Sequence, residues 1–337
     1  PTLIVGCDTR ISGGMLANAL MAGICSVGAN AIYVGVMPTP AIAYLTRKHK
    51  VDAGVVISAS HNPMEFNGIK FFNGDGYKLS DALEDEIEEL IHNNMKDVVL
   101  PIGSGVGRID YRFDLRDEYV KFMKKCVPVD LTGMKIVIDC AEGASYYTSV
   151  KTLKDLGANL VAIHTKPDGT NINANCGSTH MEELQARVVY EKADVGLAFD
   201  GDADRMLAVD EKGNLVDGDQ LMAICGCHMK KKGTLKKNTI VVTVMTNLGF
   251  SLMGEREGIR KKPAPDSVNE VLKTLECSRD RAVYIGDSDV DIQTAANAQM
   301  DHIIVEWGFR DVPFLIAKGA KVLVEKPEEI LEIVEGR

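Results

Sequence analysis

Two short stretches of the chain contain side chains that can bind a cation or move a proton, and each follows an apolar run. SASHNPMEFNGIK spans residues 58–70 and follows AGVVI, while AFDGDADR spans residues 198–205 and follows VGL. Loops that leave the carboxyl ends of buried strands are where α/β proteins place much of their chemistry. We therefore expect both stretches to form functional loops.

Three aspartates alternate in the second stretch. In a tight loop the carboxylates of Asp200, Asp202 and Asp204 can converge on one hard cation, and three carboxylates plus one outside oxygen suit Mg²⁺. A calcium EF-hand is disfavoured because its sixth loop position requires glycine, whereas this chain has Arg205 there. An acidic surface turn without a cation is also disfavoured, because carboxylates this close repel one another.

A serine beside such a site suggests phosphoryl transfer. A serine hydroxyl alone is a poor nucleophile, but a serine that faces Mg²⁺ can carry a phosphoryl group whose charge the metal neutralises. Lys70 could supply a cation or carry a proton, Arg10 could hold the phosphoserine, and Arg205 could contact the same phosphate. A Ser-His-Asp hydrolase is the alternative, but SAS lacks the G-x-S-x-G elbow of that class.

Strand and helix patterns alternate around these loops, which is typical of α/β proteins with mostly parallel sheets. Ser80 is expected to cap an acidic helix, and the glycine-rich residues 97–114 are expected to be irregular. The expected strands are 2–5, 31–34, 52–57, 135–139, 159–163, 194–199, 239–244, 282–285, 302–305 and 321–324, and the expected helices are 14–27, 117–126, 143–157, 181–191, 266–276, 289–299 and 327–335.

Composition narrows the function classes. The chain has 337 residues, enough for two or three domains, and its net charge of −10 disfavours nucleic acid as a partner. Eight scattered cysteines without a CxxC pair indicate reduced thiols and predict a cytoplasmic location. Cys225-Gly-Cys227-His228 is too tightly spaced for zinc and is expected to lie within a helix. No apolar run is long enough to predict a membrane span.

Several motifs resemble the α-D-phosphohexomutase superfamily, and within it the phosphoglucosamine mutase family. They are SASHNPMEFNGIKFFNGDGYKLS, GLAFDGDADRMLAVDEKGNLVDGDQL, GCDTRISG, NINANCGSTH and TVMTNLGF, and together they cover about residues 1–259. The resemblance implies domains at 1–115 and 116–237 and the remnant of a third at 238–259.

The same resemblance implies a mechanism. Ser60 would be the phosphoserine, and it would hold Mg²⁺ together with the three aspartates of the acidic loop. Lys70 would be the acid/base partner, with His61 close by. Glucosamine 6-phosphate and glucosamine 1-phosphate would interconvert through glucosamine 1,6-bisphosphate, which also serves as the activator.

Residues 260–337 resemble a different family. KKPAPDS and YIGDSDVDIQTAANA are similar to the C-terminal half of haloacid dehalogenase-superfamily phosphatases, near phosphoglycolate phosphatase. There Lys262 would neutralise phosphate, and Asp287 and Asp291 would form an acidic Mg²⁺ motif. The D-x-D nucleophile of that family has no counterpart upstream in its usual context, because the Asp200 loop belongs to the mutase pattern.

The chain is therefore expected to be a chimera: two phosphohexomutase-type α/β domains, the start of a third, and a Rossmann-like half-domain. The mutase motif that precedes the first strand, the sugar-recognition loop and the C-terminal phosphate-binding domain are expected to be missing. Mutase turnover is accordingly expected to be impaired. A haloacid dehalogenase-type phosphatase and an inactive Mg²⁺-binding fragment remain the alternatives. The expected partner is a sugar phosphate, with a homodimer left open.

Overall fold

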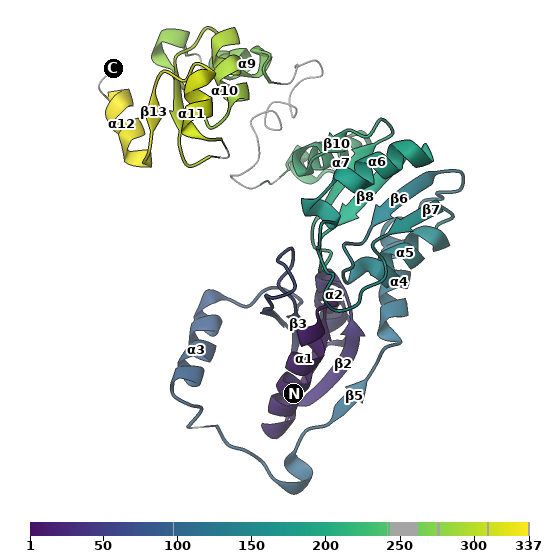
Figure 1. Ribbon diagram of the computed structural model, residues 1–337. Helices are drawn as coiled ribbons and strands as arrows, with labels where there is room; N and C mark the ends of the chain where they lie inside the picture. The colour runs from purple at the N-terminus through teal and green to yellow at the C-terminus, as the bar shows by residue number, and fades with distance from the viewer. Residues whose placement is uncertain (97, 241, 243–261, 275–276, 309, 336–337) are drawn as a thin grey trace. The chain divides into compact units, whose positions relative to one another are not determined.

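The first sheet carries the serine loop. In the computed structural model its strand order is β4-β3-β1-β2-β5 (Figure 1), and neighbouring strands are parallel except for the β3–β4 pair. The structure describes all residues except 97, 241, 243–261, 275–276, 309 and 336–337. The strands of this sheet are β1 (Thr2–Cys7), β2 (Asn30–Val36), β3 (Ala53–Ile57), β4 (Ile69–Asn73) and β5 (Ile109–Tyr111).

Helices cover both faces of this sheet because each presents apolar residues at helical spacing. On one face α1 (Ile11–Ser26) packs Met21 and neighbouring side chains against β1. On the other face α2 (Thr39–His49) contributes Ile42 and Leu45, and α4 (Leu115–Cys126) contributes Tyr119. The ends of β1 and β3 therefore lie at one edge of a well-packed layer.

The second sheet carries the aspartate loop. Its strand order is β10-β9-β8-β6-β7, with β6, β7 and β8 parallel and the β8–β9 and β9–β10 pairs antiparallel. In its core Val137 packs with Leu184 and Val188, which lie on the buried face of α6 (Glu182–Glu191). Pro1–Gly218 forms one compact unit that contains both sheets. The elements are β6 (Lys135–Asp139), α5 (Ser145–Asp155), β7 (Asn159–Ile163), η2 (Gly177–Thr179), α6 (Glu182–Glu191), β8 (Val195–Phe199), β9 (Met206–Asp210) and β10 (Leu215–Val216).

Two connecting segments differ from the sequence expectations. The stretch 97–114 contains η1 (Gly103–Gly105) and β5, because β2 offers an unpaired edge that three extended residues can join. α3 (Asp81–His92) follows Ser80 as expected, but the Ser80 side chain makes no capping hydrogen bond. No residue of α3 is buried, and the helix stands apart from the sheet in Figure 1.

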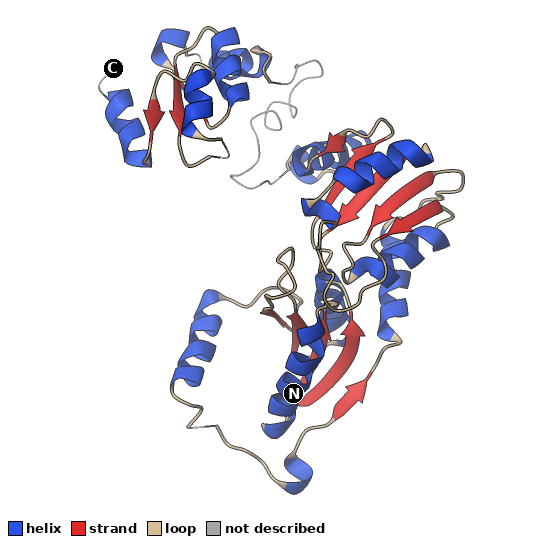
Figure 2. Ribbon diagram, viewed as in Figure 1, coloured by secondary structure: helices blue, strands red, loops and turns tan. Residues whose placement is uncertain are grey.

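The second compact unit, Asp219–Arg337, contains a small parallel sheet. Its strand order is β11-β12-β13, and Figure 2 shows helices flanking these strands. Half of the strand predicted at 239–244, and most of the remnant predicted at 238–259, lie outside the described residues. The elements are α7 (Gly218–Lys231), η3 (Lys236–Asn238), α9 (Asp266–Thr274), η4 (Arg279–Arg281), β11 (Tyr284–Gly286), α10 (Asp289–Asn297), β12 (His302–Val305), α11 (Val312–Ala317), β13 (Leu323–Val324) and α12 (Pro327–Glu335).

The α/β class with successive mixed sheets is confirmed, and so is the helical setting of Cys225 and Cys227, which lie exposed in α7. All eight cysteines are free thiols. Among the described helices, none combines the length and the apolar composition that crossing a bilayer requires.

Candidate active site

Ser60 lies at the start of the loop after β3 and faces the second sheet. Its backbone adopts a left-handed conformation, with φ of 53°, and the residue is almost completely buried. Its hydroxyl Oγ donates a hydrogen bond of 2.6 Å to Oδ2 of Asp200, although the two residues are 140 positions apart in the sequence. The structure thus brings together the two loops that the sequence singled out.

The three aspartates of the β8–β9 loop converge as predicted. One carboxylate oxygen from each of Asp200, Asp202 and Asp204 lies within 4.8 Å of the others. Oδ1 of Asp202 is buried and has no hydrogen-bond partner among the described residues. A buried carboxylate oxygen without a donor is costly unless a cation satisfies it. This hard-oxygen donor set fits Mg²⁺, with Ser60 as the fourth oxygen source.

The two buried aspartates have opposite pKa shifts. Burial raises the pKa of Asp200, and the negative charges of its two loop neighbours add to this, more than the hydrogen bond from Ser60 offsets. Burial would also raise the pKa of Asp202, but hydrogen bonds from Lys70 and Thr39 and the Lys70 charge outweigh it, so this pKa is lowered. Asp202 is therefore the firmly ionised member of the pair.

Lys70 sits on β4 and reaches the aspartate loop. Its ammonium Nζ donates to Oδ2 of Asp202 at 2.6 Å and lies 3.5 Å from Oδ2 of Asp204. Burial would lower the pKa of Lys70, but these two carboxylates outweigh burial and raise it. Lys70 is thus held as a cation at the carboxylates.

Arg10 lies beneath the serine loop. Its guanidinium is fully buried and pairs with Asp8. Nη2 donates to the backbone oxygen of Ser60 at 3.2 Å and to that of Asn62 at 2.5 Å. Ser58 Oγ donates to Asp8 at 2.6 Å and accepts from the Ser60 amide at 3.0 Å. Arg10 therefore contacts the backbone of the serine loop, and its expected contact with a phosphoryl group stays a prediction.

His61 and Arg205 lie at the exposed rim of the site. Nη1 of Arg205 is 3.1 Å from Nδ1 of His61, and the Arg205 side chain is 61% exposed. The Arg205 backbone amide also donates to Oδ1 of Asp200 at 3.1 Å, which closes the aspartate loop. The rim thus presents a cationic side chain next to His61, the residue that follows Ser60.

Two site residues had no assigned role in the sequence analysis. Thr39 donates its amide to the backbone oxygen of Asp202 at 3.0 Å and its hydroxyl to Oδ2 of the same residue at 2.5 Å. Asn173 donates its side-chain amide to the backbone oxygen of Ser60. Asn173 belongs to NINANCGSTH, so that motif was the available signal for it.

The residues predicted in the second unit form a separate cluster. Nζ of Lys262 donates to Oδ1 of Asp291 at 2.9 Å, and the Tyr284 hydroxyl donates to the same oxygen at 3.0 Å. The other oxygen of Asp291 accepts from the Ser288 hydroxyl at 2.6 Å and from the Asp287 amide at 3.2 Å. Asp291 therefore ties together the N-terminus of α10 and Lys262, and both of its oxygens already have protein donors.

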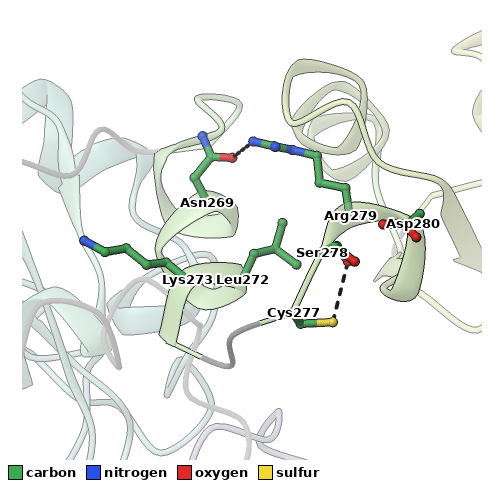
Figure 3. A pocket seen from close by; sticks show the side chains of 7 residues that line it. All are labelled: Asn269, Leu272, Lys273, Cys277, Ser278, Arg279 and Asp280. Atoms are coloured by element: carbon green, nitrogen blue, oxygen red, sulfur yellow. Dashed lines mark hydrogen bonds between the residues drawn. The ribbon is translucent and has the colours of Figure 1, made fainter.

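A surface hollow of about 620 Å³ lies elsewhere in this unit, along α9 and η4. Figure 3 shows Arg279 and Asn269 across it, joined by a hydrogen bond of 2.7 Å. None of the predicted site residues lines it. The lining residues are Asn269, Leu272, Lys273, Cys277, Ser278, Arg279 and Asp280.

Three family models match the chain. Residues 1–97 match phosphoglucomutase/phosphomannomutase alpha/beta/alpha domain I, and residues 117–213 match domain II of the same family. Residues 234–305 match the haloacid dehalogenase-like hydrolases. Both resemblances inferred from the motifs are thereby confirmed.

Curated relatives extend the first match. The chain is 63% identical over 259 residues to the phosphoglucosamine mutase of Clostridium novyi and 59% identical over 260 residues to that of Clostridium acetobutylicum. Each alignment covers 77% of this chain and 58% of the relative, so the chain spans a little over half their length. A crystal structure of a phosphoglucomutase/phosphomannomutase family protein from Burkholderia thailandensis shares the fold, with a TM-score of 0.59 at 22% identity over 96% of this chain and 62% of that one.

Proposed function

We propose that this chain, which carries the first two domains of a phosphohexomutase, moves a phosphoryl group between Ser60 and a sugar phosphate. The observation that supports this most strongly is the 2.6 Å hydrogen bond from Ser60 Oγ to Asp200 beside two further carboxylates. Relatives at about 60% identity are phosphoglucosamine mutases, which favours glucosamine 6-phosphate and glucosamine 1-phosphate as the pair interconverted. Glucosamine 1,6-bisphosphate is the proposed intermediate and activator.

The transfer can be written with bonds and protons balanced. From phosphorylated Ser60, the bond between phosphorus and Oγ breaks, and a bond between phosphorus and the attacking sugar oxygen forms. The sugar hydroxyl proton ends on Ser60 Oγ, where Asp200 accepts its hydrogen bond. In the return step Asp200 is the nearest base for the Ser60 proton and the Lys70 ammonium can protonate the leaving sugar oxygen. Solvent exchange of a proton between them restores both groups.

Mg²⁺ would be held by Ser60, Asp200, Asp202 and Asp204, and when bound it would neutralise charge on the transferring phosphoryl group. The protein's own contribution is positional. Lys70 holds Asp202 ionised, and hydrogen bonds from Ser60 to Asp200 and from Thr39 to Asp202 keep the serine next to the aspartates. Arg205 at the rim is the proposed contact for the incoming phosphate.

The domain limits that we propose are 1–115, 116–237, 238–259 and 260–337. We propose that complete mutase turnover is impaired, because residues 234–305 match the haloacid dehalogenase-like hydrolases and not a mutase domain. The phosphatase alternative for residues 260–337 has weaker support, because both oxygens of Asp291 are already bound by protein donors. Loss of p-nitrophenyl phosphate hydrolysis on changing Asp287→Asn would revive it.

The test uses the full chain with Mg²⁺ and glucosamine 1,6-bisphosphate as the phosphoryl donor. Tandem mass spectrometry should place one phosphoryl group on Ser60. Ser60→Ala should abolish the modification, while Ser80→Ala, an exposed serine outside the site, should leave it unchanged. A phosphoryl group found on another residue, or none in the wild type, would refute the proposal. Conversion of glucosamine 6-phosphate then measures how far turnover is impaired.

A further inference from the structure

The motif NINANCGSTH places a side chain directly against the serine loop. We infer that Asn173 is a positioning residue that fixes the backbone of Ser60 from the second sheet's side of the site. This inference rests on the proposed function only in giving that position a catalytic purpose. The contacts themselves belong to the structure.

The Asn173 side chain makes two hydrogen bonds to this loop. Nδ2 of Asn173 donates to the backbone oxygen of Ser60 at 2.9 Å and to that of Asn62 at 3.0 Å. Nη2 of Arg10 donates to the same two oxygens from the first domain. The turn that carries Ser60 is therefore held by one donor group from each domain. Each of its two carbonyl oxygens accepts a hydrogen bond from Arg10 and another from Asn173.

The conformation of Ser60 explains why such donors are needed. A φ of 53° places a non-glycine residue in the left-handed region, which costs about 1 kcal/mol or more unless the surroundings fix it. The carbonyl that follows this φ is the one that Arg10 and Asn173 bind. Without the second donor, the turn can relax toward an ordinary conformation, and the hydroxyl would leave its place opposite Asp200.

Asn173 is itself rigidly placed. Its backbone amide donates to the Ala141 backbone oxygen at 2.9 Å, and its own φ is 56°. Gly201 packs so tightly here that an added Cβ would lie 2.7 Å from Asn173 Nδ2 and 2.7 Å from the Ser60 oxygen. Because Gly201 stands between two of the proposed metal ligands, Asn173 touches the serine loop and the aspartate loop at one point.

The matched control lies two residues away in the same motif. Asn175 also adopts a left-handed φ, 54°, but its side chain is exposed. Glycine accepts this conformation without strain, so Asn173→Gly removes the side chain without straining the backbone, and Asn175→Gly makes the same change outside the site. Asn173→Asp keeps the size of the side chain but replaces the donor by a carboxylate that faces two carbonyl oxygens.

The first readout is hydrogen exchange, measured by mass spectrometry on peptides that contain residues 58–67. We expect exchange there to be about tenfold faster in Asn173→Gly, and faster still in Asn173→Asp, with Asn175→Gly unchanged. Peptides from β6 and β7 should exchange as in the wild type. Equal exchange in the three variants, or a rise spread evenly over Pro1–Gly218, would overturn the inference, since the latter is what a general structural role produces.

The second readout is the rate at which glucosamine 1,6-bisphosphate phosphorylates Ser60. At saturating donor, Asn173→Gly should be slower by about tenfold to a hundredfold, with the half-saturating donor concentration nearly unchanged. A faster-exchanging loop with a normal rate would overturn the positioning role. If the wild type accepts no phosphoryl group, the proposed function fails, while the exchange comparison still decides whether Asn173 holds the loop.

Discussion

Changing Thr39→Val tests whether Asp202 depends on donors from the first domain. Valine keeps the shape of threonine but removes the hydroxyl that donates to Oδ2 of Asp202 at 2.5 Å. A hydrogen bond to a charged group contributes about 1.5–3 kcal/mol, and the other oxygen of Asp202 already lacks a partner among the described residues. We therefore expect a loss of about 2 kcal/mol in the free energy of unfolding of this unit.

Thr46 provides the matched control because it lies on the same helix. Its hydroxyl donates at 2.8 Å to the Ile42 backbone oxygen, and Thr46→Val removes only this local hydrogen bond. For a unit of this size, about 2 kcal/mol corresponds to a decrease in melting temperature of about 4–8 °C. Scanning calorimetry in EDTA should show that decrease for Thr39→Val and a clearly smaller one for Thr46→Val. Equal decreases would refute the reasoning that a buried carboxylate sets the cost.

Three further predictions concern the same unit. Gly201→Ala places a methyl group 2.7 Å from polar atoms of the site and should destabilise the protein by about 2 kcal/mol or more, whereas Gly14→Ala in α1 meets open space and should be neutral or stabilising in urea unfolding. The Asp139 carboxylate 3.0 Å from Nδ1 of His164 raises the pKa of that histidine, so its stabilising effect is present below about pH 6.5 and is lost as pH rises through the folded-state pKa. His164→Asn should therefore lower the melting temperature more at pH 6 than at pH 9, and a pH-independent difference would contradict this. Mg²⁺ at about a hundred times its dissociation constant should stabilise the wild type by about 2.7 kcal/mol, and Asp202→Asn should remove most of that shift in a thermal melt.

The sequence was informative about the site where residue type and spacing alone limit the chemistry. Three aspartates at alternate positions of a tight loop can share one cation, and without a cation they would repel one another. Their convergence therefore followed from the pattern. The backbone contacts of Arg10 did not follow, because which oxygens a guanidinium reaches depends on the packing of two loops. Thr39 and Asn173 contact groups more than a hundred positions away; NINANCGSTH marked Asn173 as part of a motif, but one sequence does not show which residues such a motif contacts.

The fold shows a similar division. Buried parallel strands such as β1 and β3 are short apolar runs, and the sequence located them to within about two residues. β4 and β5 lie at the edges of their sheet, where partial burial weakens the apolar pattern, and neither was predicted. Pairing with a neighbouring strand, rather than local sequence, determines these elements.

The separation of 140 positions between Ser60 and Asp200 has a consequence for how the site comes into being. Contacts this distant in the chain cost loop-closure entropy and form late in folding, after each sheet has assembled around its own local contacts. Neither sheet alone has both the serine and the carboxylates. A nascent chain that ended near residue 115 would present the serine loop without the three carboxylates. The reactive centre would therefore arise only when the two sheets dock.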